Sequence, residues 1–357
     1  LYSDRWNRER MSNQNFSNLN RRHFLNTTAL NLGAATLIGS ARRLSAAEQA
    51  AAKPVIAETG YGRVSGTIVG TVRTFKGIPY GASTAGAARF LPPQKPKPWT
   101  GVLATRELPP RCPQLPGGLV PEYDAMEYHG PLSEDCLGLN VWTQGLKDNG
   151  KRPVMVYFHG GGVVAGSSGD ALYDGHNLAA KHNVVMVSIN HRLNIFGWLY
   201  LEEIGGEKWA QAGNAGVRDM VLALEWVRDN IENFGGDPRN VTIFGQSGGG
   251  TKTSTLLGTA PAKGLFHRAT AQSGSNVKGV TKSEAGQTAL LILAKLGLRP
   301  DQLDELQNIP YQRFLDVMSA PRQPNEPPMR LAPGVDGKII PADPFDPTAT
   351  DRKSTRL

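Results

Sequence analysis

Apolar runs bounded by turn residues set the framework of the middle of the chain. They occupy residues 153–158, 184–189, 241–244 and 269–272. Continuous runs rich in Val and Ile, unlike alternating ones, are typical of strands buried on both faces of a parallel sheet. Upstream, residues 63–80 have the pattern of extended chain broken at Gly66 and Gly70, which predicts an antiparallel beginning to the sheet.

A helix is predicted between the second and third of these runs. Its apolar positions recur at spacings of three and four residues, at Val217, Met220, Val221, Leu224, Val227, Ile231 and Phe234. Gly235 and Gly236 follow and are expected to end the helix. Strand, helix and strand in this order imply a right-handed crossover in a mostly parallel sheet. The predicted fold class is therefore α/β.

Composition narrows the class of protein. The 357 residues are 39% hydrophobic and 20% charged, as in a soluble globular protein with a sizeable core rather than a disordered chain, collagen or a membrane bundle. The formal net charge of +8 would favour nucleic acid or an anionic membrane as partner. However, residues 1–47 contribute +5 and residues 351–357 contribute +2, which leaves +1 for the middle. We therefore expect no nucleic-acid partner.

The region 11–47 resembles a twin-arginine export signal. Arg21 and Arg22 precede a mildly apolar stretch at 26–40, and small residues suited to cleavage follow at Ser45 and Ala47. The alternative is a short amphipathic helix after a basic turn. The resemblance implies a bacterial protein that engages the twin-arginine export machinery and resides in the periplasm or is secreted.

Three expectations concern the ends of the chain. Asn31 interrupts an apolar run that is too short to cross about 30 Å of hydrocarbon, so no stable membrane insertion is expected. Met11 is the expected start, with residues 1–10 as upstream translation. Residues 351–357 resemble the translation of a sequencing adapter, which predicts a truncated reading frame.

The central chemical motif is Gly245-Gln246-Ser247-Gly248-Gly249, which directly follows the apolar run 241–244. A buried strand before this G-x-S-x-G pattern and a plausible helix after it are the context of a nucleophile elbow. There the chain turns so sharply that side chains at the flanking positions would clash, which accounts for Gly245 and Gly249. A phosphate-binding loop is the alternative, but the Lys of that pattern stands one place late, at Lys252.

A second glycine cluster, His159-Gly160-Gly161-Gly162, follows the apolar run 153–158. Such a loop lets backbone N–H groups point into a shared cavity, as a developing oxyanion requires. Cys112 and Cys136 have no Cys/His cluster of metal-ligand spacing near them, so we expect no metal site, and one disulfide is compatible with the sequence.

With these motifs, residues 55–347 resemble the type-B carboxylesterase family, the cholinesterase-like branch of the α/β-hydrolases. Besides the two glycine motifs, the resemblance rests on Gly77-Ile78-Pro79-Tyr80, Arg89-Phe90 with Trp99, residues 133–142, Asn190-His191-Arg192-Leu193, Gly213-Asn214, Phe234-Gly235-Gly236-Asp237-Pro238 and Gln272-Ser273-Gly274-Ser275. It implies an α/β-hydrolase fold whose catalytic domain, residues 48–350, lacks its last part.

The resemblance also implies the site. Ser247 would be the nucleophile, and Gly161, Gly162 and Gly248 would supply backbone N–H groups to an oxyanion hole. A Cys112–Cys136 disulfide would close a loop, and two buried free thiols are the alternative. The activity would be that of a carboxylic ester hydrolase that needs no cofactor, and a non-catalytic binding protein on the same fold, as cholinesterase-like adhesion proteins are, is the alternative function.

The triad partners expected downstream of the nucleophile are missing. His267 is the only histidine after Ser247, and it precedes a strand rather than following an acid loop, so a structural role is expected for it. Asp336 is also expected to be structural, and His159 and Arg192 are expected to be structural supports. The acid and the general base are expected beyond residue 350, which predicts that this chain is inactive and poorly stable.

Two departures from the family favour small neutral esters over choline esters. Gln246 stands where many relatives have Glu, and residues 113–135 contain no Trp. Lipase, amidase and acyltransferase activities remain alternatives, because the fold hosts all of them.

Overall fold

The computed structural model describes residues 54–116, 124–276 and 278–345. The expected export signal at 11–47, the segment 1–10 and the segment 351–357 lie outside the described residues, as do both ends of the predicted catalytic domain, 48–350.

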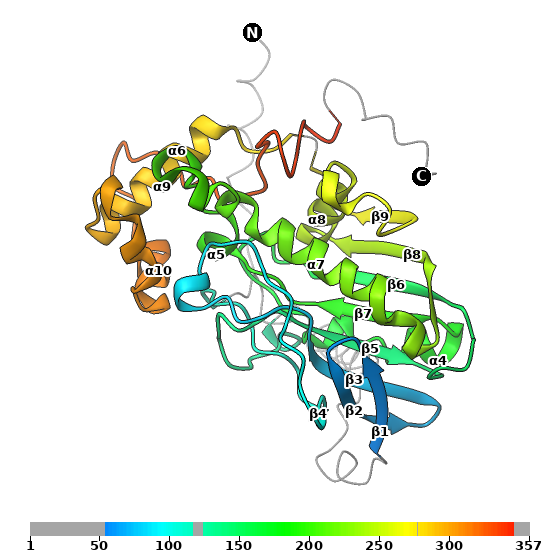
Figure 1. The fold of residues 1–357 in the computed structure, drawn as a ribbon. Coiled ribbons are helices and arrows are strands. Elements are labelled where there is room, and N and C mark those ends of the chain that lie inside the picture. The colour runs from blue at the N-terminus through cyan, green and yellow to red at the C-terminus, as the bar shows by residue number, and fades with distance from the viewer. Residues whose placement is uncertain (1–53, 117–123, 277, 346–357) are drawn as a thin grey trace, which may run out of the picture. The chain divides into compact units, whose positions relative to one another are not determined.

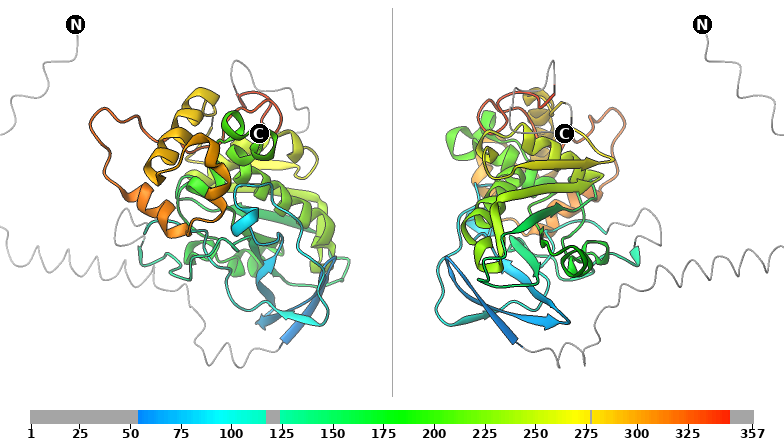
Figure 2. Two further views of the ribbon diagram at one scale, coloured as in Figure 1. Left: turned by 60° about the vertical axis from the view of Figure 1, so that its left-hand side comes forward. Right: turned by 90° about the vertical axis from the view of Figure 1, so that its right-hand side faces the viewer.

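A mixed β-sheet forms the centre of the described chain (Figure 1). Its strands are β1 (Pro54–Thr59), β2 (Gly62–Val69), β3 (Val72–Pro79), β4 (Val102–Ala104), β5 (Gly138–Thr143), β6 (Arg152–Phe158), β7 (Val185–Ile189), β8 (Gly236–Gln246) and β9 (Arg268–Gln272). They are arranged in the order β1-β2-β3-β5-β7-β6-β8-β9, with β4 beside β2. In Figure 2, β1 and β9 lie at opposite ends of the sheet.

The sheet has an antiparallel half and a parallel half. From β1 through β2, β3 and β5 to β7 every pairing is antiparallel, which confirms the predicted beginning. Strands β7, β6, β8 and β9 are mutually parallel. The prediction of a mostly parallel sheet holds for this second half only. Residues 60–61 and 70–71 are two-residue turns, and turns this short can join only antiparallel strands.

The helices cover both faces of the sheet. They are α4 (His176–His182), α5 (Asn194–Trp198), α6 (Glu202–Gly205), α7 (Ala215–Asn230), α8 (Gly248–Leu257), α9 (Lys282–Leu296) and α10 (Tyr311–Ser319). Short 3₁₀ helices η1 to η7 occupy Gly86–Ala88, Ala171–Tyr173, Gly206–Trp209, Ala212–Asn214, Ile231–Phe234, Ala260–Ala262 and Pro300–Gln307.

Alternate side chains of the parallel strands divide the core between the two faces. In β6, Val154, Val156 and Phe158 join the large cluster that includes α7, whereas Tyr157 packs with Ala179 of α4 in a smaller cluster. Strands buried on both faces in this way need apolar residues at every position, which accounts for the continuous runs in the sequence.

The predicted amphipathic helix is α7 together with η5. The α-helical part ends at Asn230, its last turn continues as the 3₁₀ helix Ile231–Phe234, and Gly235 follows with φ of +72°. Only glycine adopts this left-handed conformation without strain, so the predicted end of the helix is confirmed.

Two predictions about strands were wrong. Gly66 does not break the chain but lies inside β2, where a Cβ atom would approach Thr74 O to 2.2 Å. The run 269–272 forms β9 as expected, but most of its residues are exposed. Strand β9 is the last strand in the order of the described sheet and has a neighbouring strand on one side only. The sequence pattern therefore predicted the strand correctly but not its exposure.

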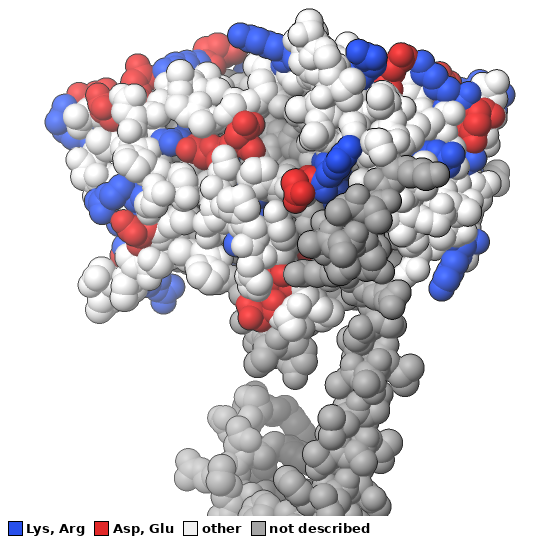
Figure 3. All heavy atoms as spheres, turned by 90° about the horizontal axis from the view of Figure 1, so that it is seen from below, with Lys and Arg blue, Asp and Glu red and all other residues white. Residues whose placement is uncertain are grey.

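The described part of the chain has no helix that is long and apolar enough to cross a membrane. On the face shown in Figure 3, Lys and Arg side chains are interspersed with Asp and Glu. This mixture agrees with the small net charge of the middle of the sequence.

Candidate active site

Ser247 occupies a sharp turn between β8 and α8. Its backbone has φ of +54° and ψ of −121°, a conformation that costs a non-glycine residue of the order of 1 to 3 kcal/mol. The Ser247 N–H donates to Gln272 O at 2.8 Å, and Thr251 N–H donates to Ser247 O at 3.0 Å. Strand β9 and helix α8 therefore hold the strained turn from both sides, and the Ser247 side chain is exposed.

Close backbone packing explains the glycines around Ser247. A Cβ atom at Gly249 would lie 2.0 Å from Phe158 O, and one at Gly245 would lie 2.6 Å from the same oxygen. Gly245 and Gly249 also pack against each other, with 2.5 Å from the Gly245 Cβ position to Gly249 C. Helix α8 thus approaches the end of β6 more closely than any side chain permits.

The glycine loop after β6 lies directly against this turn. A Cβ atom at Gly248 would meet the backbone of Gly162, at 2.2 Å from its O and 2.4 Å from its N. Gly161 and Gly162 have positive φ values of +82° and +62°, and both are exposed. The structure therefore brings together Ser247 and all three glycines that the sequence predicted for an oxyanion hole.

Hydrogen bonds set the direction of the two N–H groups in the loop. The Gly160 carbonyl lies 2.9 Å from His159 Nδ1, and the Gly161 carbonyl accepts from Ala165 N–H at 3.1 Å. In a trans peptide the N–H points opposite to the carbonyl. Fixing these two carbonyls therefore fixes the N–H groups of Gly161 and Gly162. The N-terminus of α8 adds its positive dipole end beside them.

Beneath the loop lies a buried polar cluster of Lys252, His159 and His191, referred to below as the Lys252 cluster. The rings of His159 and His191 are stacked, with centroids 4.9 Å apart and planes 9° apart. Lys252 Nζ donates to His159 O at 2.9 Å. Burial is the main cause that lowers the pKa of both histidines, and the charge of Lys252 lowers them further. Both rings are therefore neutral.

His267 and Asp336 have structural positions, as the sequence indicated. His267 precedes β9, and its Nδ1 accepts from the N–H of Val241 in the middle of β8 at 3.2 Å, so it is not bonded to Ser247. Asp336 Oδ1 accepts from the N–H groups of Lys338, Ile339 and Ile340 at 2.8 to 3.0 Å.

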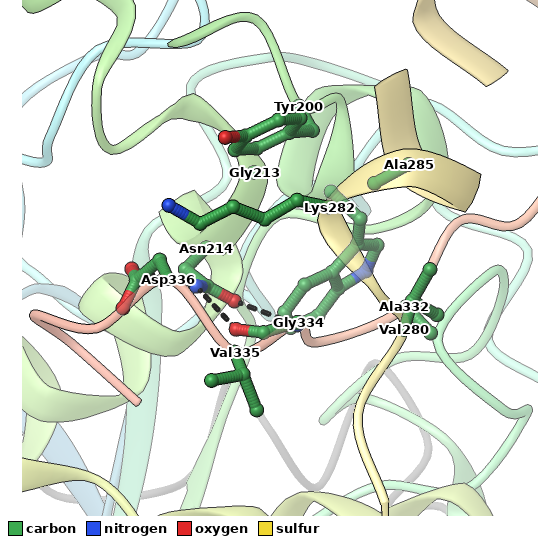
Figure 4. A pocket seen from close by; sticks show the side chains of 11 residues that line it. Tyr200, Gly213, Asn214, Val280, Lys282, Ala285, Ala332, Gly334, Val335 and Asp336 are labelled. Atoms are coloured by element: carbon green, nitrogen blue, oxygen red, sulfur yellow. Dashed lines mark hydrogen bonds between the residues drawn. The ribbon is translucent and has the colours of Figure 1, made fainter. Parts of the chain in front are cut away.

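Asn214 joins the segment around Asp336 to the start of α7. Its Nδ2 donates to Asp336 Oδ2 and to Gly334 O, each at 2.9 Å. A hollow of about 20 Å³ lies beside it, lined among others by Trp198, Tyr200 and Lys282 (Figure 4). This is room for about one water molecule, so the hollow is too small for an ester substrate.

Arg192 is a structural support, in a buried ion pair. Its Nη2 and Nε donate to the two carboxylate oxygens of Asp219 at 2.7 and 2.9 Å. The backbone N–H of Arg192 also donates to the Asp219 carboxylate. Arg192 thereby ties the loop after β7 to helix α7.

Cys112 and Cys136 lie side by side in the core as free thiols. The hydrogen bond that the Cys136 thiol makes to Cys112, together with burial, raises the pKa of Cys136 well above its usual value. Asp124, Glu127 and His129 place ligand atoms within 4.8 Å of one another near the surface. Surface groups of this kind are common without an ion, and we assign no metal to them.

Sequence reasoning missed the buried position of Lys252 beneath the glycine loop. Its position after the motif identified it only as a misplaced phosphate-loop residue. A lysine among Gly, Thr, Ser and Leu residues in a helix with a buried face was the available signal. Its acceptor, His159 O, is 93 residues away in the chain, so no local pattern predicts the pair.

A doubly packed sheet whose buried strand turns at a strained serine into a helix, beside a glycine loop at the end of the neighbouring strand, defines an α/β-hydrolase fold. The model of the carboxylesterase family matches residues 53–356. The chain therefore belongs to the carboxylesterase family.

Individual relatives agree with this assignment. The chain is 38% identical over 292 residues to para-nitrobenzyl esterase of Bacillus subtilis, covering 81% of this chain and 58% of that protein. It is 34% identical over 331 residues to mouse neuroligin-2, and this match covers 82% of this chain and 39% of neuroligin-2. The crystal structure of the Geobacillus stearothermophilus carboxylesterase EST55 at pH 6.2 superposes with a TM-score of 0.73 at 39% identity, covering 82% and 57%. The chain thus spans little more than half the length of these esterases.

Proposed function

We propose that the whole protein that carries this chain hydrolyses small neutral carboxylic esters through an acyl-enzyme on Ser247. The observation that carries the proposal is the close approach of Gly248 to Gly162, beside the strained, exposed Ser247. This combination of an accessible nucleophile and converging donors suits acyl transfer.

The reaction has two halves. Ser247 Oγ attacks the ester carbonyl carbon while a general base removes its proton, and the carbonyl oxygen becomes an oxyanion that Gly161, Gly162 and Gly248 N–H groups stabilise. The intermediate collapses, the C–O bond to the alcohol breaks, and the base returns its proton to the departing alcohol. Water then attacks the acyl-enzyme by the same route and releases the acid and free Ser247.

The base and its acid partner are proposed to come from the part of the protein that corresponds to the remaining length of its relatives. Two observations support this. His267 is the only histidine after Ser247 in the printed sequence, and it bonds to Val241 rather than to Ser247. The Asp336 carboxylate accepts hydrogen bonds from backbone N–H groups and from the Asn214 side chain. A protein that consists of these 357 residues alone is therefore expected to be inactive.

Neutral esters are the proposed substrates because Gln246 puts an uncharged amide next to the site. Its Oε1 lies 3.8 Å from the Cβ position of Gly160, beside the oxyanion loop. The whole protein is expected to hydrolyse p-nitrophenyl acetate and butyrate with a kcat/KM at least about 10-fold above that for acetylthiocholine.

Gln246→Glu is the matched variant for this preference. A carboxylate at this position attracts a cationic substrate, so the ratio is expected to move toward acetylthiocholine by roughly 10-fold, or about 1.4 kcal/mol. A wild-type protein that prefers acetylthiocholine would overturn the neutral-ester proposal and leave the role of Ser247 intact.

We also propose that the protein is exported and that Cys112 and Cys136 form a disulfide there. The adjacent buried sulfurs and the Arg21-Arg22 segment support this. A loop of this length would stabilise the fold by about 3 kcal/mol. Protein isolated from the periplasm or medium of a bacterial host, then unfolded in denaturant and alkylated without reduction, is expected to begin near residue 48 and to carry no label on either cysteine. Retention in the cytoplasm, or two labelled cysteines, would contradict the proposal.

A further inference from the structure

Lys252 is fully buried and lies in α8, five residues after Ser247. Its amine has three N–H donors, yet among the described residues it forms one hydrogen bond, to His159 O at 2.9 Å, and no ion pair. Burial alone lowers the pKa of Lys252 to about 7. An apolar side chain of the same length would avoid this desolvation, so stability gives no reason for a lysine here.

The partner of Lys252 is the residue that orients the oxyanion loop. The carbonyl of the His159–Gly160 peptide accepts from Lys252, and its N–H donates to the Tyr173 hydroxyl at 3.4 Å, so this peptide is held on both sides. Next to it, His159 Nδ1 holds the Gly160 carbonyl and thereby aims the Gly161 N–H.

The charge state of His159 depends on the same cluster. His159 can donate to the Gly160 carbonyl only from a protonated Nδ1. In the stacked partner ring, His191 Nδ1 lies 2.8 Å from Arg192 O, and its Nε2 is buried with no hydrogen-bond partner in the described part of the chain. The Lys252 charge discourages a second proton on either ring. The hydrogen bond to the Gly160 carbonyl fixes the neutral His159 ring in the tautomer that carries its proton on Nδ1.

We propose that Lys252 is a positioning residue for the oxyanion hole, which acts by holding the His159–Gly160 peptide so that the Gly161 N–H points to the substrate oxygen. This inference rests on the proposed esterase function. It predicts that Lys252 affects the transition state, in which the oxyanion exists, much more than the binding of the ester substrate.

The test compares Lys252→Met with Lys263→Met in the whole protein. Lys263 is an exposed lysine just beyond α8 and serves as the control. For p-nitrophenyl butyrate, Lys252→Met is expected to lower kcat by about 10- to 100-fold, up to the effect of losing one oxyanion donor, with KM changed less than threefold. The inhibition constant of a trifluoromethyl ketone, which forms an oxyanion on the serine, is expected to rise by the same factor as kcat falls.

Thermal unfolding at pH 6 separates positioning from a structural role. Since pH 6 lies below the folded pKa of Lys252, the amine is charged in the folded and unfolded protein, and the cost of burying the charge is fully present. The Tm of Lys252→Met is therefore expected to equal or exceed that of the wild type. Lys252→Gln, which keeps a neutral donor, is expected to show a kcat between those of the wild type and Lys252→Met. If Lys252→Met does not fold, Lys252→Gln is compared with the wild type in the same way.

The outcomes distinguish the two proposals. If the wild type and Lys263→Met hydrolyse the ester and Lys252→Met matches them in kcat and in ketone affinity, the positioning role is overturned and the esterase function stands. A lower Tm with unchanged kcat would likewise overturn it in favour of a structural role. If the wild type neither hydrolyses the ester nor binds the ketone, both proposals fail.

Discussion

Replacing Ser247 by alanine is expected to lower kcat for p-nitrophenyl butyrate roughly 10⁴- to 10⁶-fold in the whole protein, while the fold is kept. The hydroxyl is the only group removed, and no acyl-enzyme can form without it. The backbone bonds that hold the turn, Ser247 N–H to Gln272 O and Thr251 N–H to Ser247 O, involve no side-chain atom and are retained. The oxyanion donors also stay in place, so a small residual rate above that of water is expected.

The control for this prediction is Ser319→Ala, at an exposed serine at the end of α10. It is expected to match the wild type in kcat and KM. Initial rates with both p-nitrophenyl esters, together with circular dichroism spectra to check folding, provide the comparison. Retention of more than about a tenth of the wild-type kcat in Ser247→Ala would place the chemistry elsewhere.

The second large effect is expected from Gly249→Ala. The new Cβ atom would lie 2.0 Å from Phe158 O and 3.1 Å from His159 O, both of them backbone atoms at the end of β6. No side-chain rotation relieves this overlap, so α8 must move away from the sheet. We expect a loss of about 3 kcal/mol or more in the free energy of unfolding. Because Ser247 and Gly248 move with α8, kcat/KM is expected to fall by about 10²-fold or more.

Gly286→Ala is the matched control for this substitution. Gly286 lies inside α9, where the nearest atom to a new Cβ is Glu203 Oε2 at an ordinary contact distance of 3.4 Å. Alanine is a better helix former than glycine by about 1 kcal/mol, so this variant is expected to be as stable as the wild type or more so. Urea unfolding of both variants, followed by tryptophan fluorescence, measures the difference. Equal stability of Gly249→Ala and the wild type would show that the close approach of α8 to β6 is not required.

The glycine-based features of the site could be predicted from sequence because their constraints are local. Gly245, Gly249 and Gly235 stand where the backbone leaves no room for a Cβ atom or turns with positive φ, and their places relative to an apolar strand or stripe identify the turn. The same holds for Ser247, because a strand, a tight turn and a helix follow one another directly.

Features that depend on distant partners could not be predicted. Lys252 depends on His159, and Arg192 depends on Asp219 in a helix that follows it in the chain. The exposure of β9 has the same cause, because burial of a strand depends on what packs against it and not on its own residues. The contact between Gly162 and Gly248 could not be predicted either, because the two residues are far apart in the sequence. Each was assigned to the site separately.

The most direct test of the central claim is covalent labelling of the whole protein with a fluorophosphonate, followed by intact mass measurement and peptide mapping. A nucleophilic Ser247 beside an oxyanion hole predicts one adduct per molecule, located on Ser247 and absent from Ser247→Ala. No adduct, or an adduct on another residue, would contradict the account and favour a non-catalytic binding protein built on the same fold.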